Sequence, residues 1–476
     1  MIDLTKPAEI SDVTDASDAS DAQTILAGGS DRTRFDSKEA WYPVYYLGDL
    51  DRSKLATFTL LGQDLVIWWD RNAQTWRAFV DRCPHRLARL SEGRIAEDGL
   101  LECPYHGWAF TGEGDCDRIP QQPSDSKAQT SARACADALP TAECQGLLFV
   151  YAGQPENAAK VKVPSIAALE ESPKEWTLID TFRDLPYDAL TLLENVLDSS
   201  HLPFTHHRSV GNRANAAPVD LELVTSNKQG FVGAWEEGPR RGKLGRQDTV
   251  FVAPNLMWHD LTSKQFGRTM TVVYATPTSK GACRLFARFP FKFSSKIPKF
   301  FIEITPRWFS HISQNGILED DQIFLHHQER YLESIGGSNN FAKAFYLPTK
   351  ADLFVTELRK WVNQFEADPF PDQILPPALP KHVLLDRYYS HTVNCKSCRD
   401  ALKNLQRIRA GLAVIGSLSW AVATLSPFML SQISIWIVSV AVAIALSAGI
   451  AWVALGQLER RFYDGQSIPL RNVSGK

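Results

Sequence analysis

The feature that most constrains this chain is a long stretch near its C-terminus that carries no charged side chain. From Ala410 to Leu458 the sequence contains no Asp, Glu, Lys or Arg. One bilayer crossing takes about 20 apolar residues, so this stretch predicts two transmembrane helices, at about 411–430 and 433–455, joined by a turn at Ser431-Gln432. The alternative is a helix pair in a soluble core, but two segments of this length are hard to bury.

Basic residues flank the apolar stretch on both sides. Arg407 and Arg409 precede it, and Arg460 and Arg461 follow it. A hairpin places both flanks on the same side of the membrane, and the positive-inside rule identifies that side as the cytoplasm. We therefore expect a membrane anchor over residues 401–476, with the catalytic part of the chain facing the cytoplasm.

The first 35 residues predict a disordered acidic tail. They contain a near-repeat with Asp15, Asp18 and Asp21, few large apolar residues, and no arginine before Arg32. A secretory signal needs a basic start and an apolar stretch, and an organelle transit peptide is rich in arginine and poor in acids. We therefore expect a disordered tail on a protein that is made and kept in the cytoplasm. The alternative for this segment is a short helix packed on the main body.

Composition excludes several classes of protein. The chain has 476 residues, more than one compact domain usually holds. Its 51 basic and 54 acidic residues give a net charge of −3, which argues against a nucleic-acid-binding protein. Eight cysteines are too few and too scattered for a disulfide scaffold.

The expected elements indicate an α+β architecture. Leu60–Asp70 and Trp76–Val80 flank a turn, and short strands continue, which predicts a small all-β domain over residues 36–153. Strands mix with helices in a second domain, predicted over residues 154–400, which begins with a linker and contains a proline-rich junction at Pro369–Pro380. Its expected strands are Phe231–Trp235, Thr249–Ala253, Arg268–Ala275 and Cys283–Phe291, and its expected helix is Asp320–Ile335.

Two short motifs predict an iron–sulfur cluster. Cys83-Pro-His85 and Cys103-Pro-Tyr-His106 each supply one thiol and one imidazole, in the same order. In a Rieske [2Fe–2S] centre one iron takes two thiolates and the other takes two imidazoles. A structural zinc site is the alternative, but it would more often use two C-x2-C pairs.

A second constellation predicts a mononuclear iron site. His201 and His206 follow Asp198 in the segment that starts at Glu194-Asn. Two histidines and one carboxylate on one face of ferrous iron leave positions open for O2. The third ligand is expected in the predicted helix, where spacing does not decide between Asp320 and Asp321. Either of these could instead cap the start of that helix.

Taken together, these residues resemble the Rieske-type non-haem iron oxygenases, and among them the pheophorbide a oxygenase group, which includes chlorophyllide a oxygenase and the Rieske proteins of the chloroplast inner envelope. The resemblance runs from about Trp41 to Phe462. It covers the cluster loops, the Cys116-Asp-Arg-Ile-Pro-Gln segment, the histidine pair, Cys395-Lys-Ser-Cys398 and the paired apolar segments. It implies an all-β Rieske domain followed by a helix-grip-type α+β domain.

The resemblance also implies roles for individual residues. The Rieske cluster would be held by Cys83, His85, Cys103 and His106, and the mononuclear Fe(II) by His201, His206 and Asp321. In a head-to-tail homotrimer, His106 of one subunit would meet Asp198 of the next, which makes Asp198 the bridging catalytic carboxylate. The chain has no G-x-G-x-x-G segment, so the electron donor would be a separate protein, reduced ferredoxin.

The implied reaction is oxygenation, with O2, of a chlorophyll-type tetrapyrrole such as pheophorbide a or chlorophyllide a. Without a transit peptide, a cyanobacterial member in the thylakoid or plasma membrane is expected. Protochlorophyllide or a linear tetrapyrrole stays open as substrate, as does mono- or dioxygenation. Other possibilities are a Rieske electron carrier, which would not need His201 and His206, and a redox-sensing or import-associated membrane protein that uses Cys395 and Cys398.

The Cys395 and Cys398 pair lies just before the apolar segments. A C-x-x-C pair in a cytoplasmic protein suggests a reversible dithiol or half of a metal site. Zinc would need two more ligands, and only His391 lies close in the sequence. We therefore expect a regulatory disulfide that thioredoxin reduces, in which the charge of Lys396 favours the thiolate. The alternative is a purely structural pair of thiols.

Overall fold

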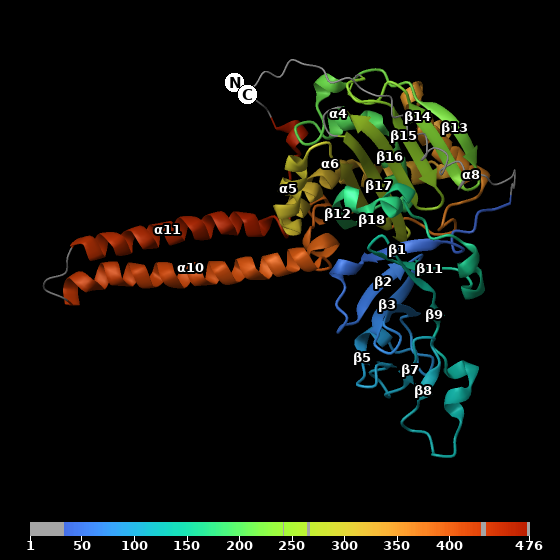
Figure 1. The fold of residues 1–476 in the computed structure, drawn as a ribbon, viewed down its shortest axis with the longest axis horizontal. Helices are drawn as coiled ribbons and strands as arrows, with labels where there is room; N and C mark the ends of the chain where they lie inside the picture. The colour runs from blue at the N-terminus through green and yellow to red at the C-terminus, as the bar shows by residue number, and fades with distance from the viewer. Residues whose placement is uncertain (1–32, 241, 264–266, 430–434, 474–476) are drawn as a thin grey trace.

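The structure, a computed structural model, describes residues 33–240, 242–263, 267–429 and 435–473. Figure 1 shows three parts: a β-rich part at one end, a larger part of sheet and helices at the other, and a long helical hairpin that projects sideways. Residues 1–32 of the predicted tail and the predicted turn at Ser431-Gln432 lie outside the described residues.

Three small antiparallel sheets build the N-terminal part. Their strand orders are β2-β3-β4-β9, β5-β6-β7-β8 and β1-β11-β10. The strands are β1 (Trp41–Tyr46), β2 (Ala56–Leu60), β3 (Gln63–Asp70), β4 (Thr75–Val80), β5 (Arg94–Ile95), β6 (Leu101–Glu102), β7 (Ala109–Phe110), β8 (Cys116–Arg118), β9 (Ala138–Leu139), β10 (Thr141–Cys144) and β11 (Leu147–Tyr151).

Strand β3 explains why this part is all β. Successive side chains of a strand point to opposite faces, and both faces of β3 are apolar. Ile67 and Trp69 pack into one core with strands β1 and β2, whereas Val66 and Trp68 pack into a second core beneath the small sheet β5–β8. The expected strand–turn–strand motif is present as β3 and β4.

A seven-stranded antiparallel sheet forms the centre of the larger part, in the order β12-β18-β17-β16-β15-β14-β13. In chain order the strands are β12 (Thr177–Leu185), β13 (Glu222–Asn227), β14 (Gly230–Trp235), β15 (Gln247–Val252), β16 (Leu256–Ser263), β17 (Gly267–Ser279) and β18 (Ala282–Lys292). The four strands expected from the sequence are β14, β15, β17 and β18, whereas β12, β13 and β16 were not expected.

The two faces of this sheet have different partners. On one face, Leu193 of helix α3 (Ala189–Leu197) and Trp361 of helix α8 (Leu353–Gln364) pack against Phe251 and its neighbours. On the other face, Phe149 of β11 packs against Tyr274. The N-terminal part is therefore attached to the larger sheet through an apolar core.

Helix α6 (Arg307–Ser334) is longer than the sequence predicts. It follows the short helix α5 (Lys296–Ile304) and begins well before the expected start at Asp320. Asp320 and Asp321 are buried within the helix, so the possibility that either one only caps its N-terminus is wrong. Short helices, η5 (Pro155–Lys160) and α2 (Ala167–Glu171), occupy the segment predicted as a linker.

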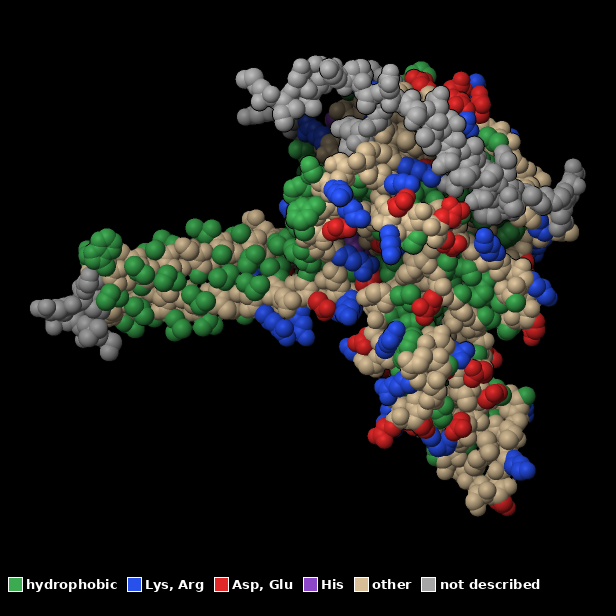
Figure 2. Space-filling model, viewed as in Figure 1, with side chains coloured by type: hydrophobic (Ala, Val, Ile, Leu, Met, Phe, Trp, Pro, Cys, Tyr) green, Lys and Arg blue, Asp and Glu red, His purple; other side chains and the backbone are tan. Residues whose placement is uncertain are grey.

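Helices α10 (Lys396–Met429) and α11 (Ile435–Arg460) form the projecting hairpin (Figure 1). Each contains an apolar segment long enough to cross a membrane, and only 6% and 11% of these segments are buried within the protein. Figure 2 shows apolar side chains along the hairpin and charged ones near its base. This exposure contradicts the alternative of a helix pair in a soluble core.

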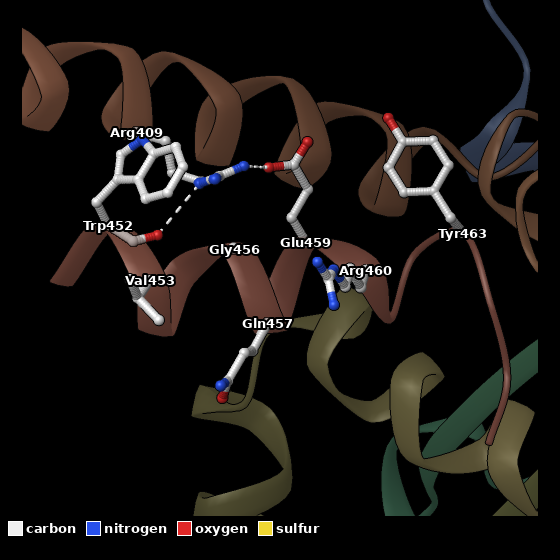
Figure 3. Close-up of a pocket in the computed structure, with 8 residues that line it drawn as sticks. All are labelled: Arg409, Trp452, Val453, Gly456, Gln457, Glu459, Arg460 and Tyr463. Carbon is white, nitrogen blue, oxygen red and sulfur yellow. Dashed lines mark hydrogen bonds and ion pairs between the residues drawn. The ribbon is translucent and has the colours of Figure 1, made fainter. Parts of the chain in front are cut away.

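The base of the hairpin is fastened by polar contacts. Arg409 of α10 donates to the carboxylate of Glu459 and to the backbone carbonyl of Trp452, both on α11, and its guanidinium lies 4.3 Å from the centre of the Trp452 ring. These side chains line a cleft of about 390 Å³, shown in Figure 3. The two helices are therefore joined by the charged residues on either side of the charge-free stretch, Arg409 and Glu459.

Candidate functional site

The two predicted cluster loops have the same backbone geometry. In each, the cysteine N–H donates to the carbonyl five residues later at 2.8 Å, and the N–H four residues later donates back to the cysteine carbonyl. That fourth residue is left-handed in both loops, with φ of 61° at Leu87 and 71° at Gly107. The sequence therefore builds two matching turns that present Cys83 and Cys103 to each other.

The cysteine and histidine side chains of these loops differ in burial. Cys83 and Cys103 are 1% and 3% exposed and contact each other, whereas His85 and His106 lie nearer the surface with ring centres 4.7 Å apart. Trp108 stacks on His85 with ring centres 4.6 Å apart. A pair of thiols below a pair of imidazoles fits a Rieske [2Fe–2S] cluster, in which each iron takes one kind of ligand.

Burial raises the pKa of the Cys83 thiol. Backbone N–H groups of the loop lower this pKa, but by less than burial raises it. The thiol therefore holds its proton more tightly than an exposed thiol, and it would have to release that proton to act as a cluster ligand.

The second predicted constellation also converges in space. The ligand atoms of His201, His206 and Asp321 all lie within 4.8 Å of one another. The Nε2 atom of each ring faces the Asp321 carboxylate, at 3.9 Å for His201 and 3.1 Å for His206. Two imidazoles and one carboxylate in this arrangement fit a ferrous ion with positions left open for O2.

Different elements hold these three side chains. His201 ends the short helix η7 (Ser199–His201), His206 follows α4 (Leu202–Thr205), and Asp321 lies within α6. The Asn195 side chain, on α3, donates to Asp321 at 3.4 Å. Asn195 therefore orients the carboxylate, a role that the sequence pattern did not indicate.

The structure separates the roles of three consecutive acids on α6. Glu319 is buried between Arg183 and Arg387, and these guanidiniums outweigh burial and lower the pKa of its carboxyl. Asp320 faces the far ring nitrogen of His206 at 3.5 Å, and Asp321 faces the near one. Asp321, rather than Asp320, joins the histidine pair.

The environment of His206 is strongly acidic. Burial lowers its pKa, but the Asp320 and Asp321 carboxylates outweigh burial and raise the pKa of His206 to about 9. A carboxylate behind a metal-binding histidine fixes the orientation of the ring and raises its basicity. Asp320 is placed to do this for His206.

The C-terminal segment reaches this site. Arg471 lies after the hairpin, in the short helix η12 (Leu470–Asn472), and donates to the backbone carbonyl of Asp320 at 2.8 Å and to that of Thr205 at 3.1 Å. Its guanidinium also lies 3.4 Å from the Asp320 carboxylate. Nothing in the sequence around Arg471 indicated this contact.

Asp198 lies beside His201 at the protein surface. Its carboxylate accepts from the Ser200 N–H at 2.8 Å and lies 4.0 Å from Nδ1 of His201, which contacts the Asp198 backbone carbonyl. Within one chain this residue is remote from the cluster loops, because the small sheet β5–β8, which flanks those loops, and helix α4 lie at opposite ends of Figure 1.

Known families match both halves of this arrangement. Residues 40–141 match the Rieske [2Fe-2S] domain and residues 251–339 match the family described as pheophorbide a oxygenase. The chloroplastic pheophorbide a oxygenase of Arabidopsis thaliana is 35% identical, over 90% of this chain and 83% of that protein. Flavonoid 8-hydroxylase 2 of Ocimum basilicum is 33% identical, over 82% of this chain and 78% of that protein.

The fold resembles solved monooxygenases. The crystal structure of dicamba monooxygenase bound to dicamba superposes with a TM-score of 0.56 and 18% identity, covering 70% of this chain and 98% of that one. These matches confirm the predicted enzyme class, the all-β Rieske domain and the two kinds of iron centre. The chain belongs to the pheophorbide a oxygenase family of Rieske-type oxygenases, which pair a [2Fe–2S] cluster with a mononuclear non-haem iron.

Proposed function

We propose that this protein is a membrane-anchored oxygenase that uses O2 and electrons from reduced ferredoxin to oxygenate a chlorophyll-type tetrapyrrole, such as pheophorbide a or chlorophyllide a. The observation that carries this proposal is the 35% identity to pheophorbide a oxygenase over 90% of the chain. That span includes far more than the cluster domain, so an electron carrier with a Rieske domain alone is not favoured.

In this proposal Cys83 and Cys103 hold one iron of the cluster and His85 and His106 hold the other. The mononuclear Fe(II), which activates O2 when it is bound, is held by three further side chains: His201, His206 and Asp321. The protein orients these ligands through groups that do not touch the metal. Asn195 donates to Asp321, and Asp320 faces the outer nitrogen of His206.

Apolar side chains next to the iron ligands support an apolar substrate. Leu202 and Phe204 lie between the two histidines in the chain, and Phe324 lies one turn after Asp321. All three are exposed. A large apolar ring system would cover such surface when it binds.

Exposed residues around the cluster support docking of another protein there. His85 and its neighbours Leu87 and Tyr105 are exposed, so a partner can approach the imidazole side of the cluster directly. Reduced ferredoxin and the next subunit of a homotrimer both need access to that side, because electrons enter and leave the cluster there.

Membrane attachment is supported by two neighbouring features. The hairpin exposes its apolar surface, and helix α5 lies beside the base of the hairpin (Figure 1). Four apolar side chains of α5 recur at helical spacing and are all more than half exposed: Ile297, Phe300, Phe301 and Ile304. An amphipathic helix at this position would lie in the membrane interface while α10 and α11 cross the bilayer of a thylakoid or plasma membrane.

Membrane insertion is tested with a charge placed in the hairpin. Leu446 lies near the middle of α11 and is exposed, and an arginine at the bilayer centre costs about 2.5–3.5 kcal/mol. We expect wild type to stay in the membrane fraction after carbonate washing and Leu446→Arg to be released in part. The control, Leu379→Arg, changes an exposed leucine outside the hairpin and should behave as wild type. Wild type that is soluble without detergent would contradict the anchor.

The substrate is tested with the full chain in lipid or mild detergent, with reduced ferredoxin and isotopically heavy O2. The panel contains pheophorbide a, chlorophyllide a, protochlorophyllide, a linear tetrapyrrole and a flavonoid. We expect label in a chlorophyll-type product, formed about a hundredfold faster than any flavonoid product.

The 33% identity to flavonoid 8-hydroxylase 2 supports a second candidate, hydroxylation of a flavonoid-like aromatic compound. Labelled product from the flavonoid alone would replace the tetrapyrrole proposal with this one. Reversible reduction of the cluster without labelled product from any compound would favour a redox-sensing role instead.

A further inference from the structure

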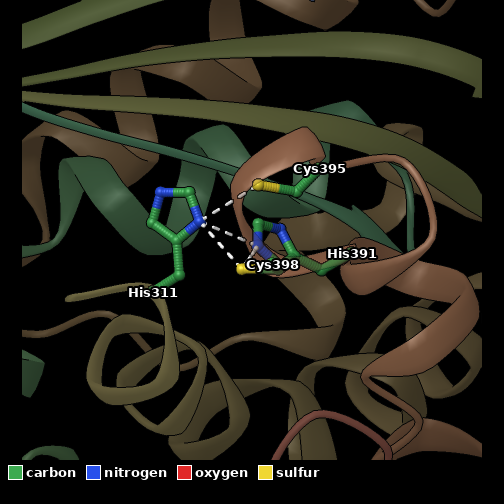
Figure 4. A group of neighbouring side chains, drawn as sticks. All are labelled: His311, His391, Cys395 and Cys398. Carbon is green, nitrogen blue, oxygen red and sulfur yellow. Dashed lines mark hydrogen bonds between the residues drawn. The ribbon is translucent and has the colours of Figure 1, made fainter. Parts of the chain in front are cut away.

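Four buried side chains outside both iron sites meet where the hairpin joins the larger part (Figure 4). His311 lies on α6, and His391 lies in the short π-helix Tyr388–Thr392. Cys395 directly precedes α10, and Cys398 lies in its first turn. Each of the four is at most 1% exposed. The sequence alone showed only three of them as neighbours, because His311 is far away along the chain.

The ligand atoms of these four residues all lie within 4.8 Å of one another. Nδ1 of His311 lies 3.0 Å from Nε2 of His391, 3.5 Å from Sγ of Cys395 and 3.4 Å from Sγ of Cys398. Nε2 of His391 lies 3.3 Å from Sγ of Cys398. The four atoms therefore surround a single point.

Hydrogen bonds behind the two rings determine which nitrogen atoms face that point. Nε2 of His311 donates to the Asp180 carbonyl at 2.8 Å, and Nδ1 of His391 donates to the Phe182 carbonyl at 2.6 Å. Both carbonyls belong to β12. A neutral imidazole has one donor and one acceptor nitrogen, so the two inner nitrogens, 3.0 Å apart, are both acceptors. Two acceptors at this distance need a proton or a cation between them.

The two thiols differ in acidity. The hydrogen bond from Cys398 lowers the pKa of Cys395, and the two histidines add to this effect. The same hydrogen bond, together with burial, raises the pKa of Cys398. The Lys396 side chain is exposed. The groups that lower the pKa of Cys395 most are the Cys398 thiol and the two histidines, and the role expected for Lys396 stays a prediction. Two thiolates and two neutral imidazoles would carry a charge of about −2, which one divalent cation neutralises.

We propose that His311, His391, Cys395 and Cys398 bind a structural zinc ion. Zinc bonds of about 2.05 Å to nitrogen and 2.3 Å to sulfur, at tetrahedral angles, place nitrogens about 3.4 Å apart and nitrogen and sulfur about 3.6 Å apart. The observed separations, from 3.0 to 3.5 Å, fit these values within a few tenths of an ångström. Four protein ligands in a buried site leave no open position, as in structural rather than catalytic zinc sites.

The backbone carbonyls of Asp180 and Phe182 accept hydrogen bonds from the outer nitrogens of the two histidines. Histidines that bind metals commonly donate their other N–H to a carbonyl or carboxylate, which fixes the ring and the tautomer. Both histidines of the proposed site do so. Neither hydrogen bond is needed for a disulfide between Cys395 and Cys398, the competing possibility for this pair.

The position of the zinc site indicates its role. It would join α10 to α6, the helix that carries Asp321, and to the π-helix. Beside it, Asp49 of the N-terminal part accepts from the Lys396 N–H at 3.0 Å and pairs with Arg307, one turn before His311, at 2.9 Å. The ion would therefore hold the base of the hairpin against the larger part, next to the contacts that Asp49 makes from the N-terminal part. It would not take part in oxygen chemistry.

The first test is the metal content of the full-length wild-type protein, purified without added zinc or chelator. We expect about one zinc per chain in addition to about three iron atoms, and a zinc X-ray absorption spectrum with two sulfur and two nitrogen neighbours. Iron does not disturb that spectrum. Absence of zinc, a fourth iron in its place, or a spectrum without sulfur would overturn the proposal, whether or not any substrate is turned over.

Variants then test which residues bind the zinc. The double variant Cys395→Ser, Cys398→Ser should lose the zinc and keep about three iron atoms per chain. Cys283→Ala, which changes a buried thiol in another core, should keep the zinc. His391→Cys should also keep it, with three sulfur neighbours. Zinc retained by the double variant would contradict the assignment, and so would a Cys395–Cys398 disulfide in the anaerobic wild type. If the double variant fails to fold, His391→Cys and the wild-type spectrum still decide.

Discussion

Replacing Asp321 with alanine is expected to remove the mononuclear iron and leave the cluster intact. The variant should contain about two iron atoms per chain instead of about three, with unchanged Rieske absorption and paramagnetic signals. Turnover should fall by more than about a hundredfold, because loss of a direct ligand exceeds the effect of losing a group that only orients one. The structural reason is that the inner nitrogens of both histidines face this carboxylate.

Asp320→Asn provides the matched comparison, since it changes the neighbouring acid on the same helix. Asp320 faces the outer nitrogen of His206 and contacts Arg471, so its loss should weaken iron binding by about 10- to 100-fold without abolishing it. Added Fe(II) should then restore much of the activity of Asp320→Asn and none of that of Asp321→Ala. The opposite result would make Asp320 the ligand.

The sequence predicted which candidate ligands lie together in space well where those residues lie close together in the chain. Each cluster loop carries its cysteine and histidine within four residues, and His201 and His206 lie on one short segment. Asp321 could not be chosen over Asp320 from periodicity, and both are buried on α6. The choice depends on how α6 is placed against α4, which is a tertiary contact.

The strands that were missed carry charges where an apolar pattern was expected. Strand β12 carries Asp180 and Asp184, which form ion pairs with arginines on the neighbouring strand, Arg288 and Arg284. Such a strand is stabilised by cross-strand ion pairs as well as by burial. A hydrophobic pattern alone does not detect it.

The complete set of proposed zinc ligands also depends on a tertiary contact that the sequence does not show. Cys395, Cys398 and His391 are neighbours in the chain, and His311 joins them only because α6 packs beside the π-helix. The sequence alone therefore predicts a redox-active dithiol at this pair. The hydrogen bonds of the two rings to β12, which identify the inner nitrogens as acceptors, are likewise visible only in the folded chain.

Two inactive variants are expected to restore activity when they assemble together. Cys103→Ser should lose the cluster, because one thiolate cannot hold its iron alone, and Asp321→Ala should lose the mononuclear iron. The two sites lie at opposite ends of one chain (Figure 1), so we expect electrons to pass from the cluster of one subunit to the iron of the next. In randomly mixed trimers, about a quarter of the interfaces would join an intact cluster to an intact iron. Co-expressed variants should therefore show about a quarter of wild-type turnover.

The position of Asp198 predicts which of the two co-expressed chains is sensitive to its replacement. Asp198 lies beside His201, so in the proposed trimer it belongs to the chain that supplies the iron. Adding Asp198→Asn to the Cys103→Ser chain should remove the restored activity while that chain keeps its iron. Adding it to the Asp321→Ala chain should leave the restored activity unchanged, because that chain supplies only the cluster. Equal loss from both placements would show that Asp198 acts elsewhere, and activity that is not restored in any mixture would contradict electron transfer between subunits.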